Sequence, residues 1–381
     1  MRFLSTAHAL AFLLIAGCSA PPATKTAPEQ DAGPQACSVD LATDAENCGV
    51  CGHSCGGGTC AESKCNAAVL ASLPTTSIPT GLVVSGETIV WGEADRKNNG
   101  VLNVCSAPDC AGTKRVLSSR VSNASRLAIV GSYLYYTSPM FGLAGGGVSS
   151  NAPSRMSLDG DGTPQFLVAA LVMRDRGATG FAVSTRGLVL ALGDQVNTKT
   201  GGLVGLCPLA GCPNSGTELN LLEKDLPTPG ELVATDTQVF ASIVANGTIV
   251  SYDRKNAQKK VLFEAEIAGQ LVQDDTDLAW GTIVPEKSSP GVTIKNYVAV
   301  GPKSGGTRVK VAETGQVTSV AMAGGFVYFA DLRGTLGRVA KTGGEVEVLA
   351  SGDTYFDLQV QDDFLYFTSP SSSSIRRLRL P

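Results

Sequence analysis

The sequence predicts an all-β protein, and two observations carry this prediction. Glycine (44 residues) and proline (19) make up 63 of the 381 residues, which together with many Ser, Thr and Asn residues favours short strands and turns over long helices. In addition, an eleven-residue block with the pattern strand, tight turn, strand aligns seven times without gaps. Apolar runs around a central turn are typical of β-hairpins. The seven blocks begin at Leu82, Leu127, Phe181, Leu232, Leu271, Val320 and Leu358.

Each block is followed by two further apolar runs, which we expect to form a third and a fourth strand, as in residues 248–265 and 335–351. The blocks recur at spacings of 38 to 54 residues. Four strands per repeat at this spacing are typical of a β-propeller blade. The second strand of each block is nearly all apolar, as expected for a sheet covered on both faces. The sequence therefore predicts a seven-bladed β-propeller over residues 67–381.

The last blade lacks a fourth strand at the C-terminus of the chain. Its third strand is expected at Ile375–Leu380, while a run that resembles the other fourth strands lies directly before the first block, at Val69–Leu73. An unpaired sheet edge invites aggregation. We therefore predict that the N-terminal strand pairs with the C-terminal one and closes the ring.

These repeats resemble TolB-like, NHL-like or YWTD-like propellers. The blades lack a consistent Trp-Asp ending and an Asp-box, so WD40 and sialidase-type propellers fit less well. The resemblance covers residues 67–381 and implies the fold without implying one activity.

The N-terminus resembles a bacterial lipoprotein signal. Residues 1–17 contain one basic residue, Arg2, and an apolar stretch that ends in "LLIAGC" at Cys18. This stretch is too short to span a bilayer. The resemblance to a lipobox implies cleavage before Cys18, lipidation of that cysteine, and sorting to the outer membrane because Ser19 follows it. An ordinary secretory signal with a chance cysteine is the alternative. Residues 18–36 are rich in Pro and Ala and predict a disordered tether.

Ten cysteines remain after Cys18, an even number that favours disulfides in an exported protein. Six of them form a module at residues 37–66, which has too few apolar residues to fold by burial and resembles Cys-rich modules of surface lipoproteins from soil bacteria. Its connectivity stays open, and zinc at Cys48, Cys51, His53 and Cys55 is the weaker alternative. We expect no metal and no cofactor. The cysteines of the module are Cys37, Cys48, Cys51, Cys55, Cys60 and Cys65, and two local pairs follow, Cys105 with Cys110 and Cys207 with Cys212.

The longest connections of the propeller follow the second strands, at 92–100, 137–153, 191–202 and 281–293. These connections share one face with the links between blades, and we expect a ligand there, around the axis. The candidate ligand-binding residues are Asp95, Arg96, Arg126, Met140, Phe141, Arg174, Arg176 and Asp194, each of which also fits an ordinary solvated loop position.

The lack of histidine in the predicted propeller limits the possible catalytic mechanisms. After cleavage His53 is the single histidine, and it lies outside the propeller. A Ser-His-Asp triad and a histidine-based metal site or general base in the propeller are therefore excluded, and we name no catalytic residue. The excess of acidic over basic residues, 34 to 30, also argues against nucleic acid as a partner.

We therefore expect a non-enzymatic binding or scaffold protein, monomeric and anchored by lipid in the outer membrane, facing the periplasm or the cell surface. Its ligand is expected to be a protein, peptide or glycan. The alternative is an axial-pocket enzyme, either a carboxylate-based hydrolase or lyase or a quinone-dependent dehydrogenase.

Overall fold

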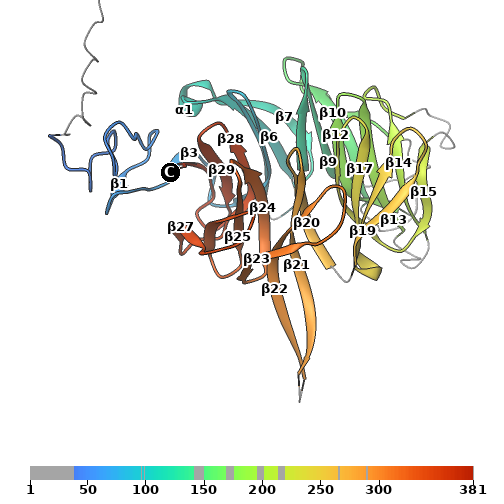
Figure 1. Ribbon diagram of the computed structural model, residues 1–381. Helices are drawn as coiled ribbons and strands as arrows, with labels where there is room; N and C mark the ends of the chain where they lie inside the picture. The colour runs from blue at the N-terminus through green and yellow to red at the C-terminus, as the bar shows by residue number, and fades with distance from the viewer. Residues whose placement is uncertain are drawn as a thin grey trace, which may run out of the picture. The chain divides into compact units, whose positions relative to one another are not determined.

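The structure is a computed structural model that describes residues 38–95, 97, 99–140, 150–168, 176–194, 201–212, 219–264, 267–288 and 291–380. All of its helices and strands lie in one unit, Val39–Pro381. Seven four-stranded antiparallel sheets follow one another along this unit, and one two-stranded sheet precedes them (Figure 1). The prediction of a seven-bladed β-propeller is therefore confirmed.

The first three blades follow the predicted order of strands. Blade one contains β4 (Ser77–Ser85), β5 (Thr88–Asp95), β6 (Gly100–Ser106) and β7 (Arg115–Val121), with a one-turn helix, α1 (Cys110–Thr113), before β7. Blade two contains β8 (Ser125–Val130), β9 (Tyr133–Met140), β10 (Ser150–Ser157) and β11 (Gln165–Phe166). Blade three contains β12 (Arg176–Ser184), β13 (Gly187–Asp194), β14 (Gly202–Cys207) and β15 (Asn220–Leu226).

The next three blades repeat this order. Blade four contains β16 (Pro229–Ala234), β17 (Gln238–Ile243), the 3-10 turn η1 (Val244–Asn246), β18 (Thr248–Asp253) and β19 (Lys259–Phe263). Blade five contains β20 (Ile267–Gln273), β21 (Asp277–Ser288), β22 (Gly291–Pro302) and β23 (Val309–Thr314). Blade six contains β24 (Val317–Ala323), β25 (Phe326–Asp331), β26 (Thr335–Ala340) and β27 (Glu347–Ser351).

Blade seven joins the two ends of the propeller. It contains β28 (Phe356–Gln361), β29 (Phe364–Ser369), β30 (Ser374–Arg379) and, as its fourth strand, β3 (Ala68–Ser72). Ser72 pairs with Ser374, and Ala68 pairs with Arg377. Figure 1 accordingly places the C-terminus beside β3. The predicted closure by the N-terminal strand is confirmed.

The ring has two faces. The loop face carries the connections from second to third strands and the links from one blade to the next, and the turn face carries the hairpin turns between first and second and between third and fourth strands. The expected loop at 281–293 is largely wrong, because β21 and β22 continue to pair as far as Ser288 with Gly291. β-Branched residues such as Thr282 and Ile283 extend this ladder, and the hairpin projects from the ring (Figure 1).

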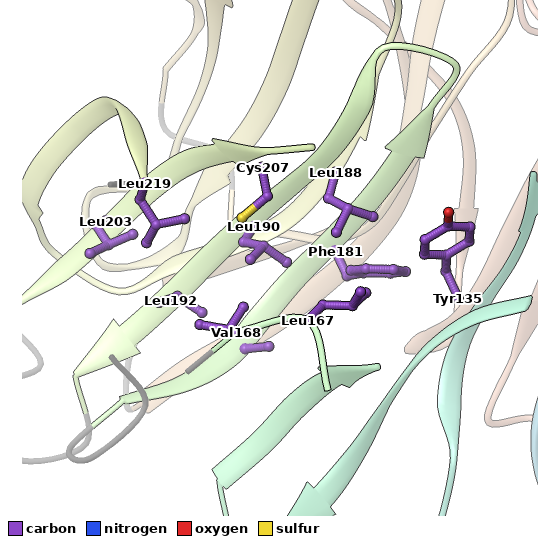
Figure 2. Close-up of a cluster of buried hydrophobic side chains, with 11 residues drawn as sticks. Tyr135, Leu167, Val168, Phe181, Leu188, Leu190, Leu192, Leu203, Cys207 and Leu219 are labelled. Carbon is purple, nitrogen blue, oxygen red and sulfur yellow. The ribbon is translucent and has the colours of Figure 1, made fainter. Parts of the chain in front are cut away.

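Large apolar side chains fill the space between neighbouring blades. Trp91 in β5 and Leu190 in β13, on second strands, have no solvent exposure. Between blades two and three, Tyr135, Leu167, Phe181 and Leu188 belong to one cluster (Figure 2). Each second strand is thus covered on both faces, which explains its continuous apolar sequence.

The small N-terminal sheet, β1 (Cys60–Ala61) with β2 (Lys64–Cys65), belongs to the Cys-rich module. Disulfides join Cys48 to Cys60 and Cys55 to Cys65, and Cys51 is also disulfide-bonded. These bonds remove Cys48, Cys51 and Cys55 from the zinc alternative. Cys37 lies outside the described residues.

The two predicted local pairs, Cys105 with Cys110 and Cys207 with Cys212, form disulfides between third and fourth strands. Each bond closes a short loop at the turn face of its blade.

Arg377 in β30 connects blade seven with the Cys-rich module. It is only 8% exposed, donates a hydrogen bond of 2.6 Å to the carbonyl of Gly56 in the module, and stacks on Phe364. A long side chain can bury its stem in this way while its polar end finds a partner. Arg377 therefore links the closing blade to the module.

Candidate functional site: a polar ring at the propeller axis

The residue directly before each repeated block lies at the same place in every blade. We call these seven residues the axial ring: Gly81, Arg126, Gly180, Glu231, Gln270, Ser319 and Asp357. Their strands, the first of each blade, pack side by side around the axis. Because each first strand starts at the loop face, the axial ring lies towards that face.

A break in strand pairing accompanies the axial ring in all seven blades. In blades two, four, five and seven, two residues of the first strand oppose one residue of the second. Such bulges redirect side chains and are frequent beside functional sites. In these four blades the ring residues are the long polar ones, Arg126, Glu231, Gln270 and Asp357. In the other three blades the shift is also one residue, but the ring residue is Gly or Ser and is itself paired with the second strand.

An axial cavity of about 710 Å³ is lined by first-strand residues of all seven blades. Its walls are apolar where Leu82, Leu271 and Leu358 contribute, and the bulges bring charged groups into it. This volume falls in the usual range of small-ligand sites, roughly 300–1,000 Å³.

An ion pair crosses the cavity between blades that are not neighbours. The Nη2 atom of Arg126 in blade two lies 2.6 Å from the Oε1 atom of Glu231 in blade four. The intervening blade has Gly180 at the ring position, so no side chain separates the pair. A Cβ atom at Gly180 would lie 2.1 Å from the carbonyl oxygen of Gly230, which requires glycine here.

Asp357 is the third charged group of the cavity. Its Oδ2 atom accepts a hydrogen bond of 2.9 Å from the Thr368 hydroxyl. Burial raises the pKa of this carboxyl to about 6, while the hydrogen bond from Thr368 acts in the opposite direction. Some of its surface still faces the cavity. The Asp357 carboxylate is thus an acceptor deep in the ring.

Two of the charged ring residues, one in blade two and one in blade seven, have a strained backbone. Arg126 has φ +50° and Asp357 has φ +52°, a left-handed conformation that is uncommon for residues other than glycine. Such strain is often found where a side chain must be held for function.

Amide and hydroxyl side chains of the cavity connect neighbouring blades. The Gln359 side chain accepts from the amide of Val84 and donates to the carbonyl of Leu82, both at 3.0 Å, which joins blade seven to blade one. The Oε1 atom of Gln270 accepts from the Ser319 hydroxyl and from the amide of Val320. These bonds hold the bulged segments in place.

The eight candidate residues chosen from the sequence have different positions. Arg126 lines the axial cavity. Asp95 is at the loop face, but its carboxylate accepts hydrogen bonds from Asn99 and from the amide of Lys97, so it fixes its own hairpin. Arg176 is paired in register with Asp194 at the loop-face ends of β12 and β13, and Met140 ends β9; their side chains are not described. Arg96, Phe141 and Arg174 lie outside the described residues.

Sequence reasoning missed Glu231, Gln270 and Asp357. The repeated block was aligned from its first apolar residue, one position after the axial ring. A polar residue directly before the first apolar residue of a block could have indicated these positions. The bulge that turns such a residue towards the axis has no sequence signature.

The comparisons with known proteins establish the fold alone. No family model and no curated protein matches the chain. Among solved structures, an oligogalacturonate lyase in complex with manganese has a TM-score of 0.60 at 11% identity, over 82% of this chain and 92% of the other. A puromycin-hydrolyzing peptidase of Mycobacterium tuberculosis has a TM-score of 0.56 at 9% identity, over 77% of this chain and 49% of the other.

The β-propeller domain of the Trilobed protease from Pyrococcus furiosus has a TM-score of 0.53 at 11% identity, over 81% of this chain and 97% of the other. That domain is described as having an open velcro topology, whereas β3 closes the ring here. The chain is thus a disulfide-bonded, seven-bladed β-propeller whose fold is shared with proteins of different activities. Within the described residues no helix is long and apolar enough to span a membrane.

Proposed function

We propose that the protein is a lipid-anchored binding protein of the bacterial cell envelope that takes a protein, peptide or glycan ligand at the loop face. The axial cavity carries this proposal, because bulges place the charged side chains of Arg126, Glu231 and Asp357 in one recess. A concave, mostly apolar site with a few placed polar groups is the usual form of a ligand-binding site.

The envelope location rests on the sequence. The stretch "LLIAGC" at Cys18 and the Pro/Ala-rich tether support a lipid anchor, and the disulfides fit an oxidising compartment. Labelling with a radioactive or clickable palmitate tests this part. The full chain should become labelled and fractionate with the outer membrane, and Cys18→Ala should abolish both; labelling that persists in this variant would contradict the anchor.

Binding is tested separately with the mature protein on glycan and peptide arrays. Retention of a ligand that Arg126→Ala weakens by at least tenfold supports binding at the axis. Retention that is equal in both proteins would place the ligand elsewhere on the ring.

A carboxylate-based hydrolase or lyase is the second candidate, and one observation favours it. Glu231 and Asp357 line the same cavity, and the raised pKa of Asp357 leaves it able to give and take a proton near neutral pH. Turnover of a polysaccharide panel that disappears in both Glu231→Gln and Asp357→Asn would support this activity. Binding without turnover would exclude it for those substrates.

A further inference from the structure

The charges of the axial cavity do not balance. Arg126 and Glu231 neutralise each other at 2.6 Å. Asp357 accepts one hydrogen bond, from Thr368, and among the described residues no cation is paired with it. The cavity therefore carries one uncompensated negative charge when Asp357 is ionised.

The surroundings of Asp357 leave space beside its carboxylate. Asp357 lines the axial cavity, and Gly81 at the ring position of the following blade faces Ser125 and Leu127 of blade two. In the preceding blade, the Ser319 hydroxyl donates to Gln270 and accepts from the amide of Leu358, so it is already engaged. Among the described residues, the carboxylate thus has one hydrogen-bond donor, Thr368, and a side open to the cavity.

A metal ion fits these surroundings poorly. Calcium takes six to eight oxygen ligands, and magnesium takes six in near-ideal geometry. The Glu231 carboxylate is paired with Arg126, and the side-chain oxygens of Gln270 and Gln359 already accept hydrogen bonds from Val320 and Val84. The Asp357 carboxylate is the one that remains. One carboxylate in a cavity with leucine walls instead suits an organic cation with an apolar stem.

We propose that the axial cavity binds a lysine side chain of a peptide or protein ligand, with the ammonium group paired to the Asp357 carboxylate and the methylene stem against Leu82 and Leu358. This inference rests on the proposed binding function and names the group that is recognised. The Gln270 side-chain nitrogen, which has no hydrogen-bond acceptor among the described residues, is free to donate to a carbonyl of the same ligand.

The test uses the mature protein and two acetylated, amidated pentapeptides, Gly-Gly-Lys-Gly-Gly and the same peptide with norleucine in place of lysine. Norleucine keeps the apolar stem and removes the charge. Affinities are measured by calorimetry or NMR titration at pH 7.5 and at pH 5. We expect the lysine peptide to bind at least tenfold more tightly than the norleucine peptide at pH 7.5, and this preference to shrink at pH 5, where Asp357 is protonated.

Asp357→Asn removes the charge and keeps an acceptor for Thr368, so it should abolish the preference. Asp362→Asn is the matched control, because Asp362 lies in the same blade, also has a left-handed backbone (φ +54°) and is exposed at the turn face. A melting curve of each variant verifies the fold.

The inference is overturned if the lysine peptide fails to bind, if norleucine binds equally well, or if Asp357→Asn keeps the preference. None of these three outcomes would by itself contradict the proposed binding function. A ligand found on the arrays whose retention survives Asp357→Asn leaves that function intact and removes only the ammonium site.

Discussion

The buried carboxyl of Asp357 makes a quantitative prediction about stability. Its pKa is raised from 3.8 to about 6 in the folded protein. The folded state therefore binds this proton more tightly than the unfolded state does, and the contribution of Asp357 to stability falls as pH rises through the window from about 4 to 6. A shift of this size corresponds to about 3 kcal/mol at most, from roughly 1.4 kcal/mol per pKa unit.

Asp357→Asn isolates this effect, because asparagine cannot ionise. Below pH 4 the two proteins should have similar free energies of unfolding, since Asp357 is then protonated. At pH 7.5 the variant should be more stable than the wild-type protein by up to about 3 kcal/mol. The comparison cancels the other acids of the chain, such as Asp331, whose pKa is lowered by hydrogen bonds from Thr314 and backbone amides despite its burial.

Urea unfolding at pH 4, 5.5 and 7.5, followed by tryptophan fluorescence, measures the difference between the two proteins. Trp91 and Trp280 are both fully buried, so their emission reports loss of the core. Asp362→Asn serves again as the control and should show no pH-dependent gain. A raised pKa of Asp357 is contradicted if Asp357→Asn is equally or less stable than the wild-type protein at pH 7.5, or if the difference between the two proteins does not change with pH.

Three further predictions concern the ring. A double-mutant cycle of Arg126→Met and Glu231→Gln should give a coupling of about 1 kcal/mol in urea unfolding, because the pair is partly exposed; zero coupling would mean that the two side chains do not pair. Gly180→Ala should lower the free energy of unfolding by more than about 2 kcal/mol, since its Cβ would collide with the carbonyl of Gly230. In the control Gly269→Ala, the Cβ would lie 3.5 Å from the nearest atom, and the loss should be about 1 kcal/mol or less. Equal losses in the two variants would contradict the close approach at Gly180. Deletion of residues 67–75 should open the ring and lower the melting temperature, and an unchanged melting temperature would refute closure by β3.

The fold could be predicted because it depends on patterns that are local and repeated. The block that starts at Leu82 recurs in every blade, and its apolar and turn positions fix two strands each time. The closure of the ring could also be predicted from the sequence. Val69 belongs to a run that resembles the other fourth strands, and Ile375 belongs to a third strand that otherwise has no partner.

The axial site could not be predicted to the same degree. Whether Arg126 or Asp357 points to the axis depends on a bulge, and a bulge adds one residue without a distinct composition. The pairing of Arg126 with Glu231 depends on Gly180 in another blade, which only the three-dimensional arrangement shows. The prediction of a loop at 281–293 was wrong because regular strand pairing continues there, although the sequence resembles a connection.

The closure by β3 also has a mechanical consequence. β3 is antiparallel to β30, which begins at the loop face, so the chain enters the propeller at the turn face. If Cys18 anchors the protein, force on the anchor reaches the propeller at the N-terminal end of β3. The hydrogen bonds between β3 and β30 are perpendicular to the strands, so a force along β3 loads them in shear and they share it. The strand that completes the ring would then also be the attachment through which the propeller carries its load.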